Sequence, residues 1–223
     1  MEIRPLDREK YAGRKFTARY RTSGYYDIRA TADGFRISYT ALSAAVEKSF
    51  DDEFFGEWLE APVAFGAFCG EELLGYVEGS PESWNSRFRI SNICVFDASR
   101  RGAGVGTALM EVIINEARSA GARMIVLETQ SCNEKAIAFY KKNGFEMIGF
   151  DLYSYSNNDP GRHEVRIEMG RKLKRADTWI AVRAAARHDR NILHASDYLS
   201  VVRRKIDGRS LHEKECTFGD IRQ

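Results

Sequence analysis

The chain has 223 residues, of which 43% are hydrophobic and 30% are charged, and its formal net charge is +2. These values are typical of a soluble globular protein, and the length suffices for one large domain with or without an extension. No apolar run approaches the roughly 18 residues that a membrane helix needs, and the charged residues 1–10 are unlike a secretory signal. We therefore expect a cytoplasmic protein with no membrane partner.

The first 96 residues predict helices followed by strands. We expect two N-terminal helices, the second over 41–60, where it ends in the acidic and aromatic run "DDEFFGEWLE". Residues 61–70 and 73–84 read as the two strands of a hairpin. Residues 87–96 alternate like a central strand, with Phe88 and Cys94 predicted on the same face.

After residue 104 the spacing of the apolar residues changes from that of a strand to that of a helix. Apolar side chains recur at helical spacing from Val105 to Ala120, and Gly121 is a typical helix stop. A buried strand over 123–130, a second helix over 131–145 and two further strands over 145–155 and 162–173 follow. We predict an α/β protein with one mixed sheet in a domain over 1–173, and a helical extension over 174–223.

Charge and cysteine spacing exclude several functions. The four cysteines and four histidines lack zinc or disulfide spacing, so we predict no metal ion. Basic residues outnumber acidic ones in 174–223, and acidic residues outnumber basic ones before residue 174. A mildly acidic body suits a cationic small molecule better than nucleic acid.

The stretch "SRRGAGVGT" places glycines where a strand passes into a helix. Backbone N–H groups without neighbouring Cβ atoms, at the positive end of a helix, favour a pyrophosphate. A nucleotide-hydrolysing P-loop would need a Lys that is absent, and a dinucleotide fingerprint would need a glycine where Thr107 stands. The dinucleotide interpretation stays open because Glu128 lies near a ribose-binding position, as does a glycine turn without a ligand.

Two motifs carry a family resemblance. "RGAGVG" and the downstream "N-x-x-A-x-x-F-Y-x-x-x-G-F" (133–145) resemble the coenzyme A-binding segments of the GNAT superfamily of N-acetyltransferases. "SGYYDIR", "GYVEGSPESWN" and "LETQSCNEKAIAFYKKNGF" are similar to the streptothricin acetyltransferases, which acetylate an amino group of an antibiotic and thereby give resistance. The resemblance implies the GNAT fold, acetyl-CoA as cofactor, and acetyl transfer to a primary amine of a small cationic acceptor.

The resemblance also implies roles for individual residues. Tyr140 would act as general acid at the coenzyme sulfur, and Asn133 would bind the pantetheine arm or cap its helix. The backbone at Cys94 and Val95 would separate from the next strand and bind the acetyl carbonyl. The remaining predicted coenzyme-binding residues are Arg100, Arg101, Gly102, Ala103, Gly104, Val105, Gly106 and Thr107.

Acidic and aromatic residues supply candidates for the acceptor side. Glu78 and Glu128 lie in apolar strands, where a charge is costly without a partner or a function, so each is a candidate general base. The predicted cation-binding residues are Tyr26, Asp27, Trp84 and Asp151.

Two other functions remain open at this point. A protein or peptide N-acetyltransferase would act on a terminal or lysine amine. A non-catalytic regulator would bind acyl-CoA and use the basic extension as a nucleic-acid arm. We expect instead that the extension packs on the domain or joins two copies of the chain in a homodimer.

Overall fold

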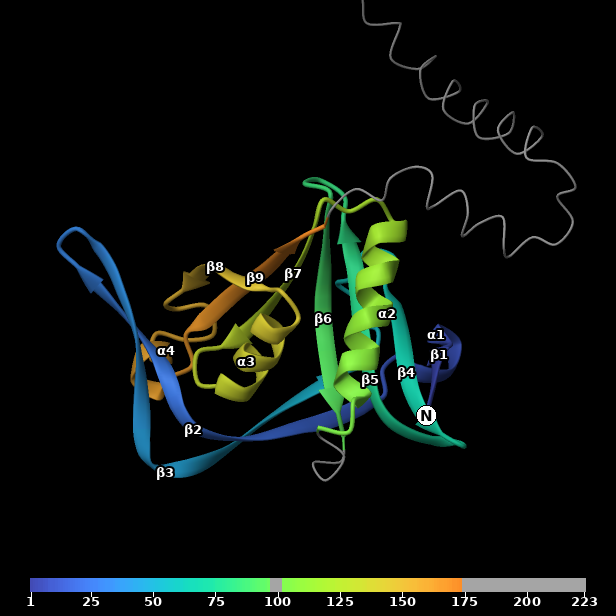
Figure 1. The fold of residues 1–223 in the computed structure, drawn as a ribbon, viewed down its shortest axis with the longest axis horizontal. Helices are drawn as coiled ribbons and strands as arrows, with labels where there is room; N and C mark the ends of the chain where they lie inside the picture. Colours follow the sequence, from blue (N-terminus) through green and yellow to red (C-terminus); the bar gives the residue numbers. More distant parts are fainter. Residues whose placement is uncertain (97–101, 174–223) are drawn as a thin grey trace, which may run out of the picture. The chain divides into compact units, whose positions relative to one another are not determined.

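A computed structural model describes residues 1–96 and 102–173 (Figure 1). Seven strands form one sheet in the order β1-β4-β5-β6-β7-β9-β8, in which β6 and β7 are parallel and the other neighbours are antiparallel. The predicted mixed sheet is therefore confirmed, whereas the predicted helical extension over 174–223 lies outside the described residues. The strands are β1 (Glu2–Pro5), β4 (Val63–Cys69), β5 (Glu72–Glu82), β6 (Arg87–Val95), β7 (Met124–Gln130), β8 (Glu146–Asp151) and β9 (Arg166–Lys172).

Two helices pack on this sheet. α2 (Val105–Ser119) follows the glycine-rich segment, and α3 (Glu134–Lys142) follows β7. Their apolar sides join side chains of β5, β6, β7 and β9 in the larger hydrophobic core. α1 (Arg8–Tyr11) and α4 (Asp159–Arg162) are single turns. None of the described helices is long and apolar enough to cross a membrane.

The predicted helix over 41–60 is wrong, because most of that segment is strand. β2 (Lys15–Thr31) and β3 (Gly34–Glu53) form a long antiparallel hairpin. Ala32 and Asp33 make a two-residue turn between the paired Thr31 and Gly34, and Gly34 has a φ of 148°, which glycine adopts readily. β3 pairs with β2 on both sides of an irregularity at residues 42–45, and this pairing outweighs the helix propensity of the Ala-rich sequence, as tertiary context often does.

The hairpin is attached to β7, α3 and α4. The Tyr20 hydroxyl donates to the Gln130 side chain at 2.6 Å, and the Lys48 ammonium lies 2.6 Å from Glu164. At the start of α3, the carboxylate of Glu134 accepts hydrogen bonds from the Ser23 N–H and the Tyr39 hydroxyl. Figure 1 shows the hairpin passing the carboxyl end of β7 and continuing beside α4.

A bulge interrupts the pairing of β5 with β6. Glu78 pairs with Asn92 and Gly79 pairs with Ile90, so Ser91 is an extra residue. The extra residue reverses the alternation along β6. The prediction that Phe88 and Cys94 share a face is therefore wrong: Phe88 lies in the larger core, and Cys94 packs against a second cluster on the opposite face.

Candidate active site

The glycine loop opens directly onto the N-terminus of α2. Gly102 and Gly104 have φ angles of 90° and 87°, a left-handed conformation that glycine adopts without strain. Gly104 is the N-cap residue, and among the described residues no side chain caps the helix. The first-turn N–H groups are therefore available to an anion, in a field that favours negative charge. Arg100 and Arg101 lie outside the described residues.

The parallel strands separate in front of this loop. Pairing of β6 with β7 extends only from Arg87 opposite Met124 to Ile90 opposite Leu127, although both strands continue beyond these residues. On its other side β6 stays paired with β5 as far as Val95. The β6–β7 ladder thus ends at Ile90, before the Cys94–Val95 segment to which the resemblance assigns the acetyl carbonyl.

Tyr140 projects from α3 into the buried part of the domain and lies near Cys94. Burial raises the pKa of Tyr140 well above its usual value, and the Cys94 thiol adds to the rise. The phenol therefore stays protonated at neutral pH and is a potential proton donor. Asn133 caps α3, since its side chain accepts a hydrogen bond from the Ala136 N–H.

Glu78 is buried beside the β6 bulge, on the face of the sheet opposite α2 and α3. It is 1% exposed, and its carboxylate accepts hydrogen bonds from the Phe55 N–H at 2.5 Å and the Ser91 hydroxyl at 3.0 Å. Burial raises the pKa of Glu78, and these two donors offset only part of the rise. A carboxylate with a raised pKa is a suitable acceptor for a proton near neutral pH.

Glu128 belongs instead to a charged network on the same face of the sheet. Its carboxylate lies 2.5 Å from the Arg166 guanidinium and 4.0 Å from Arg89, and Arg89 also binds Glu82 and Glu168. Two arginines therefore neutralise the surroundings of Glu128. The burial of Glu78 and the ion pairs of Glu128 distinguish the two candidate bases and favour Glu78.

Two of the predicted cation-binding residues, Tyr26 and Asp27, contact cationic side chains of this same chain. The Lys141 ammonium lies 4.8 Å above the Tyr26 ring and 3.1 Å from its hydroxyl. Asp27 forms an ion pair with Arg29 at 2.6 Å. Asp151 ends β8 in register with Arg166.

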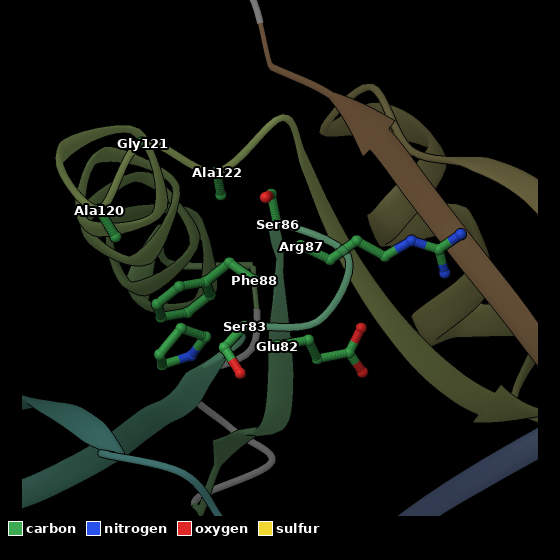
Figure 2. Close-up of a pocket in the computed structure, with 9 residues that line it drawn as sticks. Glu82, Ser83, Ser86, Arg87, Phe88, Ala120, Gly121 and Ala122 are labelled. Atoms are coloured by element: carbon green, nitrogen blue, oxygen red, sulfur yellow. The ribbon is translucent and has the colours of Figure 1, made fainter. Parts of the chain in front are cut away.

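Trp84 is not brought to this region. It is 84% exposed in the turn between β5 and β6, at the end of the hairpin opposite the Gly75–Val95 pair. The pocket in Figure 2, of about 170 Å³, lies at the same end, between this turn and residues 120–122 after α2. A 15-residue helix is about 22 Å long, so this pocket and the glycine loop lie at opposite ends of α2.

A set of aromatic residues beside Glu78 was not predicted from the sequence. Phe16, Phe54 and Tyr76 belong to the second cluster, and their rings contact one another and Phe96. The run "DDEFFGEWLE" contains Phe54 and was the signal for this cluster in the sequence. Because 41–60 was predicted to be a helix, the run could not be placed relative to β5.

Comparisons with known proteins agree with this geometry. A family model described as the acetyltransferase (GNAT) family matches residues 31–145, just over half of the 223 residues. Streptothricin acetyltransferase of Escherichia coli is 32% identical over 130 residues, which cover 58% of this chain and 72% of that protein.

Two solved structures align with 78% of this chain, and the alignment covers 98% of each solved chain. A nourseothricin acetyltransferase has a TM-score of 0.63 at 27% identity. A Bacillus anthracis protein in complex with acetyl coenzyme A has a TM-score of 0.57 at 22% identity and shows likeness of fold alone.

Proposed function

Because the chain belongs to the acetyltransferase (GNAT) family, we propose that it acetylates a primary amine of a small cationic acceptor, with a streptothricin-like antibiotic as the leading candidate. The acceptor class is supported by the E. coli relative and by the nourseothricin acetyltransferase structure. Acetyl-CoA, the acetyl donor of this family, supplies the acetyl group as an activated thioester.

The separation of β6 from β7 beyond Ile90 is the observation that carries this proposal. It leaves the Val95 end of β6 outside the β6–β7 ladder and beside Gly106 at the start of α2. The N-terminus of α2, which has glycine as its N-cap residue, and the left-handed Gly102 and Gly104 fit a diphosphate, because N–H groups without bulky neighbours can approach its oxygens. The residues present therefore fit coenzyme A.

Three groups of the chain have the properties that acetyl transfer requires. An amine must lose a proton to attack, and an alkylamine has a pKa of about 10.4. Glu78, with its raised pKa, would accept that proton directly or through water. The Val95 backbone N–H would donate to the carbonyl oxygen as negative charge develops there. Tyr140, which burial keeps protonated, would protonate the departing sulfur.

An acetyl-CoA consumption assay over a panel of amines tests the proposal. We expect turnover with streptothricin and slower turnover with polyamines and aminoglycosides. The Glu78→Gln variant should lose most of the activity, and the Glu128→Gln variant should keep more of it. Turnover with basic peptides alone would point to a protein N-acetyltransferase, and absence of coenzyme A binding would reject acetyl transfer altogether.

A further inference from the structure

The second cluster surrounds a buried hydroxyl that has no partner among the described residues. Tyr76 is fully buried on β5, and its hydroxyl forms no hydrogen bond there. A buried polar group without a partner is rare in native proteins and costs stability. Tyr76 pairs with Cys94 in register, so it lies beside the stretch of β6 that we assign to the acetyl carbonyl.

Aromatic rings enclose Tyr76. Its ring centroid lies 4.2 Å from that of Phe54, 5.2 Å from Phe16 and 5.9 Å from Phe96, and these three rings also contact one another. Phe96 is 36% exposed, so the ring cluster reaches the surface at this residue. An aromatic ring that is partly accessible at the surface is suited to contact an organic ammonium ion.

Two carboxylates accompany these rings. Glu78 lies two residues after Tyr76 on the same face of β5, and Asp52 pairs in register with Phe16 on the hairpin. The negative charge of Asp52 acts on both Tyr76 and Glu78, whereas Arg8 is the cation that acts on Glu78. No ion pair involves Asp52 within the part of the chain that the structure describes.

We infer that Tyr76 and Asp52, with the rings of Phe16, Phe54 and Phe96, form an acceptor subsite for compounds with two amino groups. The Tyr76 oxygen accepts a hydrogen bond from the reacting amine, whose proton passes to Glu78. Asp52 holds the second, non-reacting ammonium ion. This inference rests on the proposed function and adds to it a preference for diamines over monoamines.

The Asp52→Asn variant tests the second ammonium site. Its control is Asp51→Asn, since Asp51 is the adjacent carboxylate on β3 and binds the Thr17 hydroxyl. Cadaverine and pentylamine serve as a diamine and a monoamine of equal length. We expect Asp52→Asn to lower the ratio of kcat/KM for cadaverine to kcat/KM for pentylamine about tenfold, the effect of one charge-assisted contact, because any effect on Glu78 is common to both amines. Equal effects of the two variants would overturn the inference.

The Tyr76→Phe variant tests the hydroxyl. It keeps the ring packing and removes an atom that has no protein partner, so its Tm should be unchanged or higher. We expect kcat/KM to fall about tenfold for both amines, with the Kd of acetyl-CoA unchanged. Wild-type kcat/KM in this variant would overturn the role of Tyr76.

Calorimetry separates the subsite from the reaction. Cadaverine is titrated into the protein saturated with coenzyme A, which cannot transfer acetyl. Binding that Asp52→Asn weakens and Asp51→Asn does not would support the subsite even if no amine were acetylated. Turnover in the wild type with unchanged cadaverine binding in Asp52→Asn would overturn the subsite and leave the proposed function standing.

Discussion

Replacement of Ser91 by Ala probes how the chain sets the proton affinity of Glu78. Ser91 is the extra residue of the β6 bulge, and its hydroxyl donates to one carboxylate oxygen of Glu78 at 3.0 Å. The Phe55 N–H donates to the other oxygen. The Ser91→Ala variant removes one of these two donors without adding volume, so the effect falls on the charged form of the carboxylate.

The size of the expected pKa change follows from the difference between two values for the Ser91–Glu78 hydrogen bond, one with Glu78 ionised and one with Glu78 protonated. A hydrogen bond to a charged group contributes about 1.5–3 kcal/mol, and one to a neutral group about 0.5–1.5 kcal/mol. The carboxylate therefore loses about 1.4 kcal/mol more than the protonated acid, which corresponds to about one pKa unit. Since burial already raises the pKa of Glu78, Ser91→Ala should raise it further by about one unit.

The pH profile of kcat is the appropriate measurement, because kcat reports groups in the complex with bound substrates. The base must be ionised, so a higher pKa moves the acidic limb of the profile to higher pH and leaves the plateau unchanged. Ser38→Ala, on the exposed face of β3, is the control. An acidic limb at the same pH in Ser91→Ala and wild type would refute Glu78 as the base.

Three further predictions concern coenzyme binding, acid catalysis and stability. Gly104→Ala should weaken coenzyme A binding about fivefold, because its left-handed backbone costs a side chain about 1 kcal/mol, whereas Gly161→Ala, in open space at an ordinary φ, should bind normally. Tyr140→Phe should lower kcat at least about tenfold while the Kd of acetyl-CoA stays constant, and full turnover would exclude Tyr140 as the acid. Arg89→Met should lower the free energy of unfolding in urea by about 2 kcal/mol, because it leaves Glu82 and Glu168 without their shared partner. Burial opposes ionisation of Glu82, but Arg89 holds the pKa of Glu82 below its usual value. The stability that this ion pair contributes is therefore fully present above the pKa that Glu82 has in the unfolded chain. The difference in unfolding free energy between wild type and Arg89→Met should disappear as pH falls through the pKa of Glu82 in the folded protein.

Local signals account for the part of the fold that the sequence predicted correctly. The apolar stripe that begins at Val105, the stop at Gly121 and the cap at Asn133 each act within a few residues, and α2 and α3 begin and end close to them. The GNAT resemblance rested on these same segments and is confirmed by the family model. Glu78 is buried in its strand as predicted, while its role as base stays a prediction.

The errors concern properties that depend on distant partners. The helix over 41–60 failed because β2 decides the conformation of that segment. The extra residue at Ser91 is visible only against β5, since alternation in a single strand carries no register. The position of Trp84 at the far end of the β5–β6 hairpin likewise depends on the sheet as a whole, and its role in binding a cation stays a prediction.

The attachment of the hairpin to Glu134 has a consequence for protein engineering. Residues 15–53 supply Phe16 and Asp52, which we assign to the acceptor side. Ser23 and Tyr39 of the same segment donate hydrogen bonds to Glu134 in the first turn of α3. A chimera that imports this segment from a relative with another acceptor must therefore import a compatible residue at position 134. Transplanted without it, the segment would disturb the helix that carries Tyr140, and altered selectivity would come with a slower chemical step.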